Sequence, residues 1–254
     1  MIGGWLIPLL AAGGFIGLLE LANYYSPWLI LFGGLAVAWP ILCSGFFLRL
    51  HRRSVLATHH FSLPFLSLII SAFLIFIFID RPLLRQIIII VAGILVYLDF
   101  FYLSLLARGS AKYPPRALER IGSVLLALSA FFIFSALFGW VTFLANTFWP
   151  TMVLALLISW LLDFEALFLN HRETAKVAFI SLIISVLIVE FFWVISLWPL
   201  GFLIKGWILT IIMLNGLGIA SDYMDKRFHP KKTLIRGIFS AVLIVLIMVL
   251  ARWI

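Results

Sequence analysis

Charge and cysteine are scarce in this sequence. Asp, Glu, Lys and Arg together make up 11% of the 254 residues, whereas a soluble domain carries about 25%. A chain with so few charges has too little polar surface to cover a globule in water, which excludes a soluble enzyme or a soluble binding domain. The single cysteine, Cys43, excludes an intramolecular disulfide.

Signatures of the common catalytic and metal sites are missing as well. The sequence contains no HExxH zinc motif, no GxSxG nucleophile turn and no Walker lysine. His59, His60 and His171 fall in predicted loops, without the spaced Glu or His ligands that zinc requires. We therefore predict no metal site and no cofactor. The sequence leaves open whether the protein is an enzyme.

Long apolar runs fill most of the chain. Hydrophobic residues make up 65% of it, and the mean hydropathy is +1.22. Each run is close to the about 20 residues that cross the hydrocarbon core as a helix. The runs cover residues 4–23, 28–50, 62–80, 84–107, 119–143, 148–170, 174–197, 202–221 and 233–253. They predict an all-α fold, a polytopic integral membrane bundle of nine transmembrane helices in one transmembrane domain, residues 1–254.

The basic residues predict the orientation of this bundle. If the loops after the second, fourth, sixth and eighth helices are cytoplasmic, these loops and their flanks hold 14 of the 18 Lys and Arg residues. Such an asymmetry is the positive-inside pattern, so we expect a cytoplasmic N-terminus and a C-terminus outside. Seven of the ten tryptophans lie toward the outer helix ends, as in an interfacial aromatic belt. The expected location is the cell membrane, with a prokaryotic plasma membrane as the favoured kind.

The net charge of +8 and the pI of 10.0 raise the question of an anionic partner. The basic residues are divided among short loops, so the sequence offers no module that holds a nucleic acid. Attraction to anionic lipid headgroups at the cytoplasmic loops is the expected consequence. The bilayer is thus the predicted partner, and the sequence leaves open a membrane-protein partner or a homo-oligomer.

Two of the predicted helical hairpins resemble each other. Both contain Leu-Asp-Phe, at Leu98–Phe100 and at Leu162–Phe164, with an offset of 64 residues. Each Asp precedes a basic residue at the predicted cytoplasmic end of its helix. Transport proteins often consist of repeats, with a binding site at the repeat interface. The pattern therefore favours a bundle built from repeated helical hairpins.

Asp99 and Asp163 are the strongest candidates for a functional site. Each lies about two turns, or ~12 Å, from the cytoplasmic end of its predicted helix. A charged side chain at mid-membrane costs ~2.5–3.5 kcal/mol and usually faces the protein interior. Asp163 shares a helix face with Ser159 and Asn170, at spacings of four and seven residues. We predict that Asp99 and Asp163 meet and share a proton or a cation.

Two further polar positions complete the candidate set. Asn215 begins a second stripe of small and polar residues, with Gly218 and Asp222 at helical spacing. Glu190 lies deep in the seventh predicted helix, so we expect it to point into the bundle, with Lys205 or Glu20 as its nearest charged neighbour. The predicted ligand- or proton-binding residues are Asp99, Asp163, Asn215 and Glu190.

One stretch has the appearance of an enzyme loop. The segment SDYMDKRFHPKK, residues 221–232, resembles slightly the Asp-rich loop of UbiA-type prenyltransferases, which are also nine-helix proteins. This resemblance would imply that Asp222 and Asp225 hold a magnesium diphosphate. The segment departs from the family because it precedes the last predicted helix instead of following the second. A second Asp-rich loop is also missing from the sequence.

These observations favour a carrier or permease-like protein, which binds a small polar or lipid-linked ligand in a cytoplasm-facing polar cavity. Two alternatives stay open. One is an integral membrane enzyme that acts on a lipid or isoprenoid phosphate. The other is a non-catalytic membrane subunit, in which the acids only form hydrogen bonds between helices. Each such bond would contribute about 0.6 kcal/mol to stability.

Overall fold

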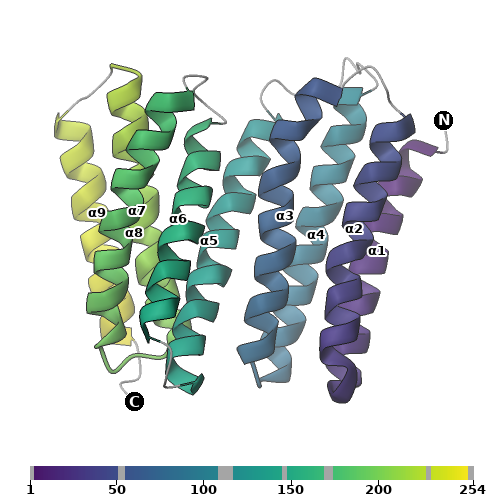
Figure 1. Ribbon diagram of the computed structural model, residues 1–254, viewed down its shortest axis with the longest axis horizontal. Coiled ribbons are helices and arrows are strands. Elements are labelled where there is room, and N and C mark those ends of the chain that lie inside the picture. Colours follow the sequence, from purple (N-terminus) through teal and green to yellow (C-terminus); the bar gives the residue numbers. More distant parts are fainter. Residues whose placement is uncertain are drawn as a thin grey trace. The chain divides into compact units, whose positions relative to one another are not determined.

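The structure is a computed structural model that describes residues 3–50, 55–107, 117–144, 148–168, 174–226 and 230–250. Over these ranges the chain forms nine α-helices, one short 3-10 helix and no strand (Figure 1). The elements are α1 (Gly3–Tyr24), η1 (Ser26–Trp28), α2 (Leu29–Leu50), α3 (Val55–Phe78), α4 (Pro82–Ala107), α5 (Ala117–Leu144), α6 (Phe148–Phe168), α7 (Thr174–Ser196), α8 (Phe202–Met224) and α9 (Pro230–Leu250). The prediction of an all-α fold is confirmed.

Eight of the described helices are long and apolar enough to cross a membrane. The exception is α3, in which the apolar stretch with described side chains is the shorter segment Pro64–Phe78. The protein is thus a multi-pass helical membrane protein, since helices satisfy their own backbone groups in lipid. The count of nine membrane-spanning helices and the orientation stay predictions.

One predicted loop is part of a helix. The sequence reading placed His59 and His60 in a connection that ends at residue 61, but α3 already begins at Val55. The prediction was wrong because it read the start of a helix from the start of its apolar run. The histidines follow the apolar residues Val55–Ala57 and continue the helix, because backbone hydrogen bonds form whatever the polarity of the side chain.

The chain divides into two compact units, Met1–Ser129 and Ala130–Ile254, and the division falls within α5. The first unit contains α1 to α4, and the second contains α6 to α9. The single transmembrane domain and the hairpin repeat both stay predictions.

In the first unit, α1 packs against α2 and α4, and α3 packs against α4. Small residues let these helices approach closely. The indole ring of Trp39 lies where a Cβ atom on Gly14 would be, and its Nε1 donates a hydrogen bond to the carbonyl oxygen of Leu10 at 3.0 Å. This contact joins α1 to α2 through one aromatic side chain.

In the second unit, α7 packs against both α6 and α8. Two aromatic pairs stack in it. Phe138 and Phe192 are buried, with ring centroids 4.4 Å apart, and the half-buried Phe131 stacks on the exposed ring of Trp207 at the same distance. Gly206 brings α8 close to α5, because a Cβ atom there would lie 2.8 Å from the backbone nitrogen of Ser135. The core of this unit is therefore aromatic and tightly packed.

The last helix has a different environment. α9 packs mainly against α8, and none of the residues in its apolar segment Thr233–Leu250 is buried. Its side chains therefore face lipid on most sides. Two polar contacts, described below, join it to α8.

Candidate functional site

Asp163 lies on the buried face of α6. The buried residues of this helix are Thr151, Ala155, Ser159, Leu162, Asp163 and Leu167. Five of them, all except Leu162, follow each other at intervals of four residues, which places them in one row along the helix. The row consists of small or polar residues apart from Leu167, so α7 can pack closely against α6. The prediction that Asp163 is an interior group is confirmed, since its side chain is 0% exposed.

The hydroxyl group of Ser185, on α7, is the contact that reaches the Asp163 carboxylate. Its Oγ donates a hydrogen bond to Asp163 Oδ2 at 3.1 Å and lies 2.6 Å from the carbonyl oxygen of Ser181. A serine hydroxyl carries one proton, so the two acceptors compete for the same donor. The other carboxylate oxygen, Asp163 Oδ1, is buried and has no hydrogen-bond partner among the described residues.

Two more buried serines lie one helical turn before this pair, Ser159 before Asp163 on α6 and Ser181 before Ser185 on α7. Ser159 and Ser181 are both 0% exposed, and their hydroxyls donate to carbonyl oxygens of their own helices. Trp160 Nε1 donates to the carbonyl oxygen of Ala178 at 3.3 Å and joins α6 to α7 on the same side. Ser159, Asp163, Ser181 and Ser185 form what we call the serine–carboxyl centre.

The serine–carboxyl centre has no cation among the described residues. Lys205, the buried lysine of this unit, instead donates to the carbonyl oxygen of Ser196 at 3.0 Å, and its Nζ lies 5.9 Å from the ring centroid of Phe138. Glu165 has one buried carboxylate oxygen without a hydrogen-bond partner as well. A buried carboxylate that lacks a counter-ion is costly, so α6 carries two acidic groups with free capacity for a positive species.

Asp99 is also buried, with 6% of its side chain exposed, on α4. Its neighbour Phe100 packs edge-on against Phe65 of α3, with ring centroids 5.2 Å apart. Asp99 belongs to the first unit and Asp163 to the second. The meeting of the two carboxylates therefore stays a prediction.

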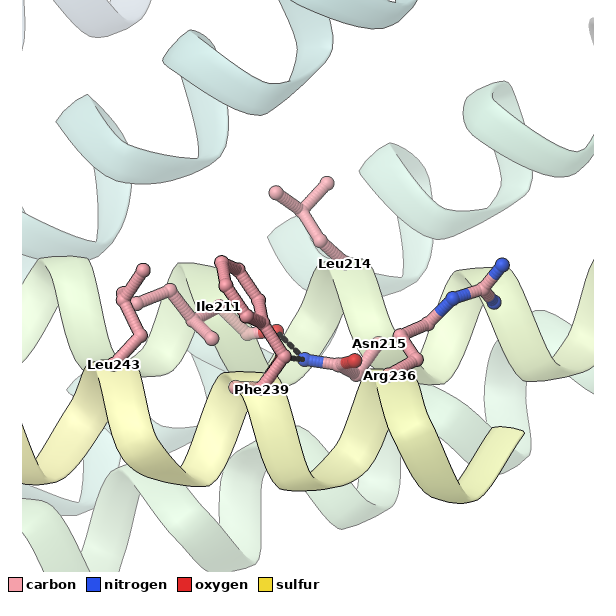
Figure 2. A pocket seen from close by; sticks show the side chains of 7 residues that line it. Ile211, Leu214, Asn215, Arg236, Phe239 and Leu243 are labelled. Atoms are coloured by element: carbon pink, nitrogen blue, oxygen red, sulfur yellow. Dashed lines mark hydrogen bonds between the residues drawn. The ribbon is translucent and has the colours of Figure 1, made fainter. Parts of the chain in front are cut away.

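Asn215 lies at the contact between α8 and α9. Its Nδ2 donates to the carbonyl oxygen of Ile211 at 2.7 Å and to Oγ of Ser240, on α9, at 2.6 Å. The two helices enclose an open groove of about 270 Å³ beside this pair (Figure 2). The stripe predicted from Asn215, Gly218 and Asp222 thus faces α9.

Glu190 does not point into the core of its unit. Its side chain is exposed on α7, and it forms no ion pair with a described residue. The sequence prediction was wrong because depth in a helix does not fix the direction of a side chain. Glu20, the other residue proposed beside it, instead accepts a hydrogen bond from Gln86 Nε2 at 3.0 Å in the first unit.

Asp222, on α8, makes an ion pair with α9. Its Oδ2 lies 3.4 Å from Nη1 of Arg236. Over the described part of the chain, no group of three or more His, Cys, Asp or Glu side chains is placed to hold a metal ion. The resemblance to the Asp-rich loop therefore has no geometric support at Asp222.

The sequence reading missed three of the residues that matter here. Ser181 and Ser185 were not singled out within their apolar run, although their four-residue spacing places two hydroxyl groups on one helix face. Arg236 was counted only as a basic residue near a cytoplasmic loop. Its position seven residues before Leu243, on the face that meets α8, was the available signal.

A family model described as "Protein of unknown function (DUF5656)" matches residues 45–250 of the chain. The match includes both Asp99 and the serine–carboxyl centre. No curated protein and no solved structure matches the chain.

Proposed function

The chain belongs to this family of proteins of unknown function, and we propose that it is a carrier or permease-like membrane protein. In this proposal the serine–carboxyl centre binds a proton or a small cation and couples it to the movement of a small polar or lipid-linked ligand. The family description assigns no activity, so the support comes from the geometry of the centre.

One observation carries the proposal: Asp163 is completely buried, yet Oδ1 of its carboxylate has no hydrogen-bond partner among the described residues. An ionisable group inside a membrane helix is expensive and marks ion or proton pathways. A purely structural Asp would use both oxygens, because an unsatisfied buried acceptor costs about 1–3 kcal/mol. A proton or a cation on this carboxylate removes that cost.

Ser185 gives the centre two states. When the carboxylate is free, the hydroxyl proton of Ser185 is drawn to Asp163 Oδ2, at 3.1 Å. When a proton or cation occupies the carboxylate, the hydroxyl donates fully to the carbonyl oxygen of Ser181, at 2.6 Å. Occupancy of Asp163 therefore changes the hydrogen bond that joins α6 to α7, and a ligand can use this difference to shift a conformational equilibrium.

Infrared spectroscopy of the purified protein in lipid nanodiscs tests this proposal. The carbonyl stretching band of a protonated carboxyl group is recorded from about pH 4 to about pH 10, roughly the range between the ordinary pKa values of carboxyl groups and of lysine. The titration is done with and without Na⁺. We expect a band that is lost in Asp163→Asn and whose midpoint moves when Na⁺ is present.

The matched control is Glu190→Gln, which makes the same chemical change on an exposed side chain. It should leave the Asp163 band unchanged. If the Asp163 band responds to neither pH nor Na⁺, the carboxylate exchanges no ion and the proposal fails. An effect of Asp163→Asn on thermal stability alone would indicate the structural role instead.

A further inference from the structure

The groove between α8 and α9 has two chemically different ends. Its apolar walls come from Ile211 and Leu214 on α8 and from Phe239 and Leu243 on α9. Arg236 stands at one end and Leu243 at the other (Figure 2). They are seven residues apart on α9, or about 10 Å along the helix axis. The groove therefore runs from a cation into an apolar interior.

Arg236 lies near the start of the apolar segment of α9. It comes three residues after Thr233, where the apolar segment of α9 begins. A long basic side chain at such a position extends toward the membrane surface while its stem lies along apolar groups. The guanidinium group of Arg236 lies over Gly218, where no Cβ atom obstructs it.

The guanidinium of Arg236 has unused binding capacity. Its side chain is 43% exposed, and its ion pair with Asp222 is one contact of 3.4 Å. A guanidinium has five N–H donors in a planar fork, which match two oxygens of a phosphate. The single long contact with Asp222 leaves most of these donors available.

The interior of the groove suits a hydrocarbon chain. Its polar groups, Asn215 and Ser240, bond to each other at 2.6 Å, and Nδ2 of Asn215 also donates to the carbonyl oxygen of Ile211. These bonds occupy the amide donors, so the groove beyond Arg236 presents mainly apolar surface. A ligand that fits both ends is anionic at its head and apolar along its tail.

We infer that this groove binds one anionic phospholipid of the surrounding bilayer, with its phosphate on Arg236 and an acyl chain between Leu214 and Phe239. The positive charge at the end of an apolar groove matches the charge and the shape of such a lipid. The inference is independent of the serine–carboxyl centre, which lies between α6 and α7.

Native mass spectrometry of the purified protein tests the inference. Delipidated protein is titrated with phosphatidylglycerol, and in parallel with zwitterionic phosphatidylcholine and with inorganic phosphate. We expect one phosphatidylglycerol molecule to bind with preference over phosphatidylcholine. Inorganic phosphate should not displace it, because phosphate lacks the tail.

Substitutions separate the groove from general surface charge. Arg236→Gln should weaken phosphatidylglycerol binding roughly tenfold or more, the loss that corresponds to a hydrogen bond with a charged group. Lys231→Gln removes the same charge from an exposed position on the same helix and should bind as the unmodified protein does. Arg236→Lys keeps the charge but loses the planar fork, so its affinity should lie between that of the unmodified protein and that of Arg236→Gln. This variant keeps the test decisive if Arg236→Gln fails to fold.

Asp222→Asn supplies a test in the opposite direction. It removes the carboxylate that competes with the phosphate for Arg236, so binding should become tighter. A loss of binding in Asp222→Asn would overturn the inference. Equal losses of binding in Arg236→Gln and Lys231→Gln would also overturn the inference, because they would indicate diffuse electrostatic attraction. Binding of phosphatidylcholine as tight as that of phosphatidylglycerol would overturn it too.

Discussion

Substitution of Gly206 by Ala should destabilise the second unit, because this glycine sets the distance between α8 and α5. A Cβ atom on Gly206 would lie 2.8 Å from the backbone nitrogen of Ser135 and 2.9 Å from its Cα atom. Backbone atoms cannot rotate away as a side chain does. The two helices must therefore separate, which also disturbs the stacked rings of Phe131 and Trp207, 4.4 Å apart.

Two opposing terms set the magnitude. Overpacking of a tight interior costs about 1–3 kcal/mol. Replacement of Gly by Ala within a helix returns about 0.5–1 kcal/mol. The free energy of unfolding of Gly206→Ala should therefore fall by about 1 kcal/mol, within limits of about 0 and 2.5 kcal/mol.

The measurement is reversible unfolding in sodium dodecyl sulfate, followed by tryptophan fluorescence. Gly237→Ala is the matched control, because no atom lies within 4 Å of a Cβ at that position, and it should be neutral or stabilising. Gly218→Ala should lie between the two, since it meets only the flexible end of Arg236. Addition of Ser135→Ala to Gly206→Ala should restore part of the loss, because the nearest obstructing atom is Ser135 Oγ, which has no hydrogen-bond partner among the described residues. Equal stability of Gly206→Ala and Gly237→Ala would refute the close approach of α8 to α5.

Three other predictions use different measurements. A double-mutant cycle of Asp163→Asn and Ser185→Ala should give a coupling energy of about 0.6 kcal/mol in unfolding experiments. Zero coupling would contradict the hydrogen bond between Ser185 and Asp163. Trp39→Phe should lower the free energy of unfolding by about 0.5–1.5 kcal/mol through loss of its bond to Leu10, whereas Trp149→Phe, on an exposed residue, should not. Cysteines introduced in a Cys43→Ala background should resist impermeant thiol reagents added outside intact cells, and labelling at two of the four would contradict the predicted orientation. The four positions are Arg52, Lys112, Arg172 and Lys231.

The helices were predictable because lipid imposes one rule on every residue of a span. Unpaired backbone groups have no partner in hydrocarbon, so apolar runs of about 20 residues become helices. The predicted orientation rests on 14 of the 18 basic residues, and Arg52, Lys112 and Arg172 are among those that lie outside the described residues. Asn170, the end of the predicted polar stripe on α6, lies outside them too.

The candidate site was predictable in part, for a physical reason. The spacing of Ser159 and Asp163 identified the buried face of α6, because helical geometry alone determines which residues share a face. The partner of that face depends on which helix packs against it, and hydropathy carries no such information. Ser185 and the exposed direction of Glu190 therefore required the structure.

The exposure of α9 has a consequence for how freely its sequence can change. None of the residues of Thr233–Leu250 is buried, so an outward-facing Ile, Val or Leu can be exchanged for another apolar residue at little cost in protein contacts. Lipid selects only for hydropathy at these positions. Ser240 and Arg236 are constrained instead by Asn215 and Asp222. Across relatives, α9 should therefore diverge in sequence while it keeps its mean hydropathy, and the residues at positions 236 and 240 should vary least.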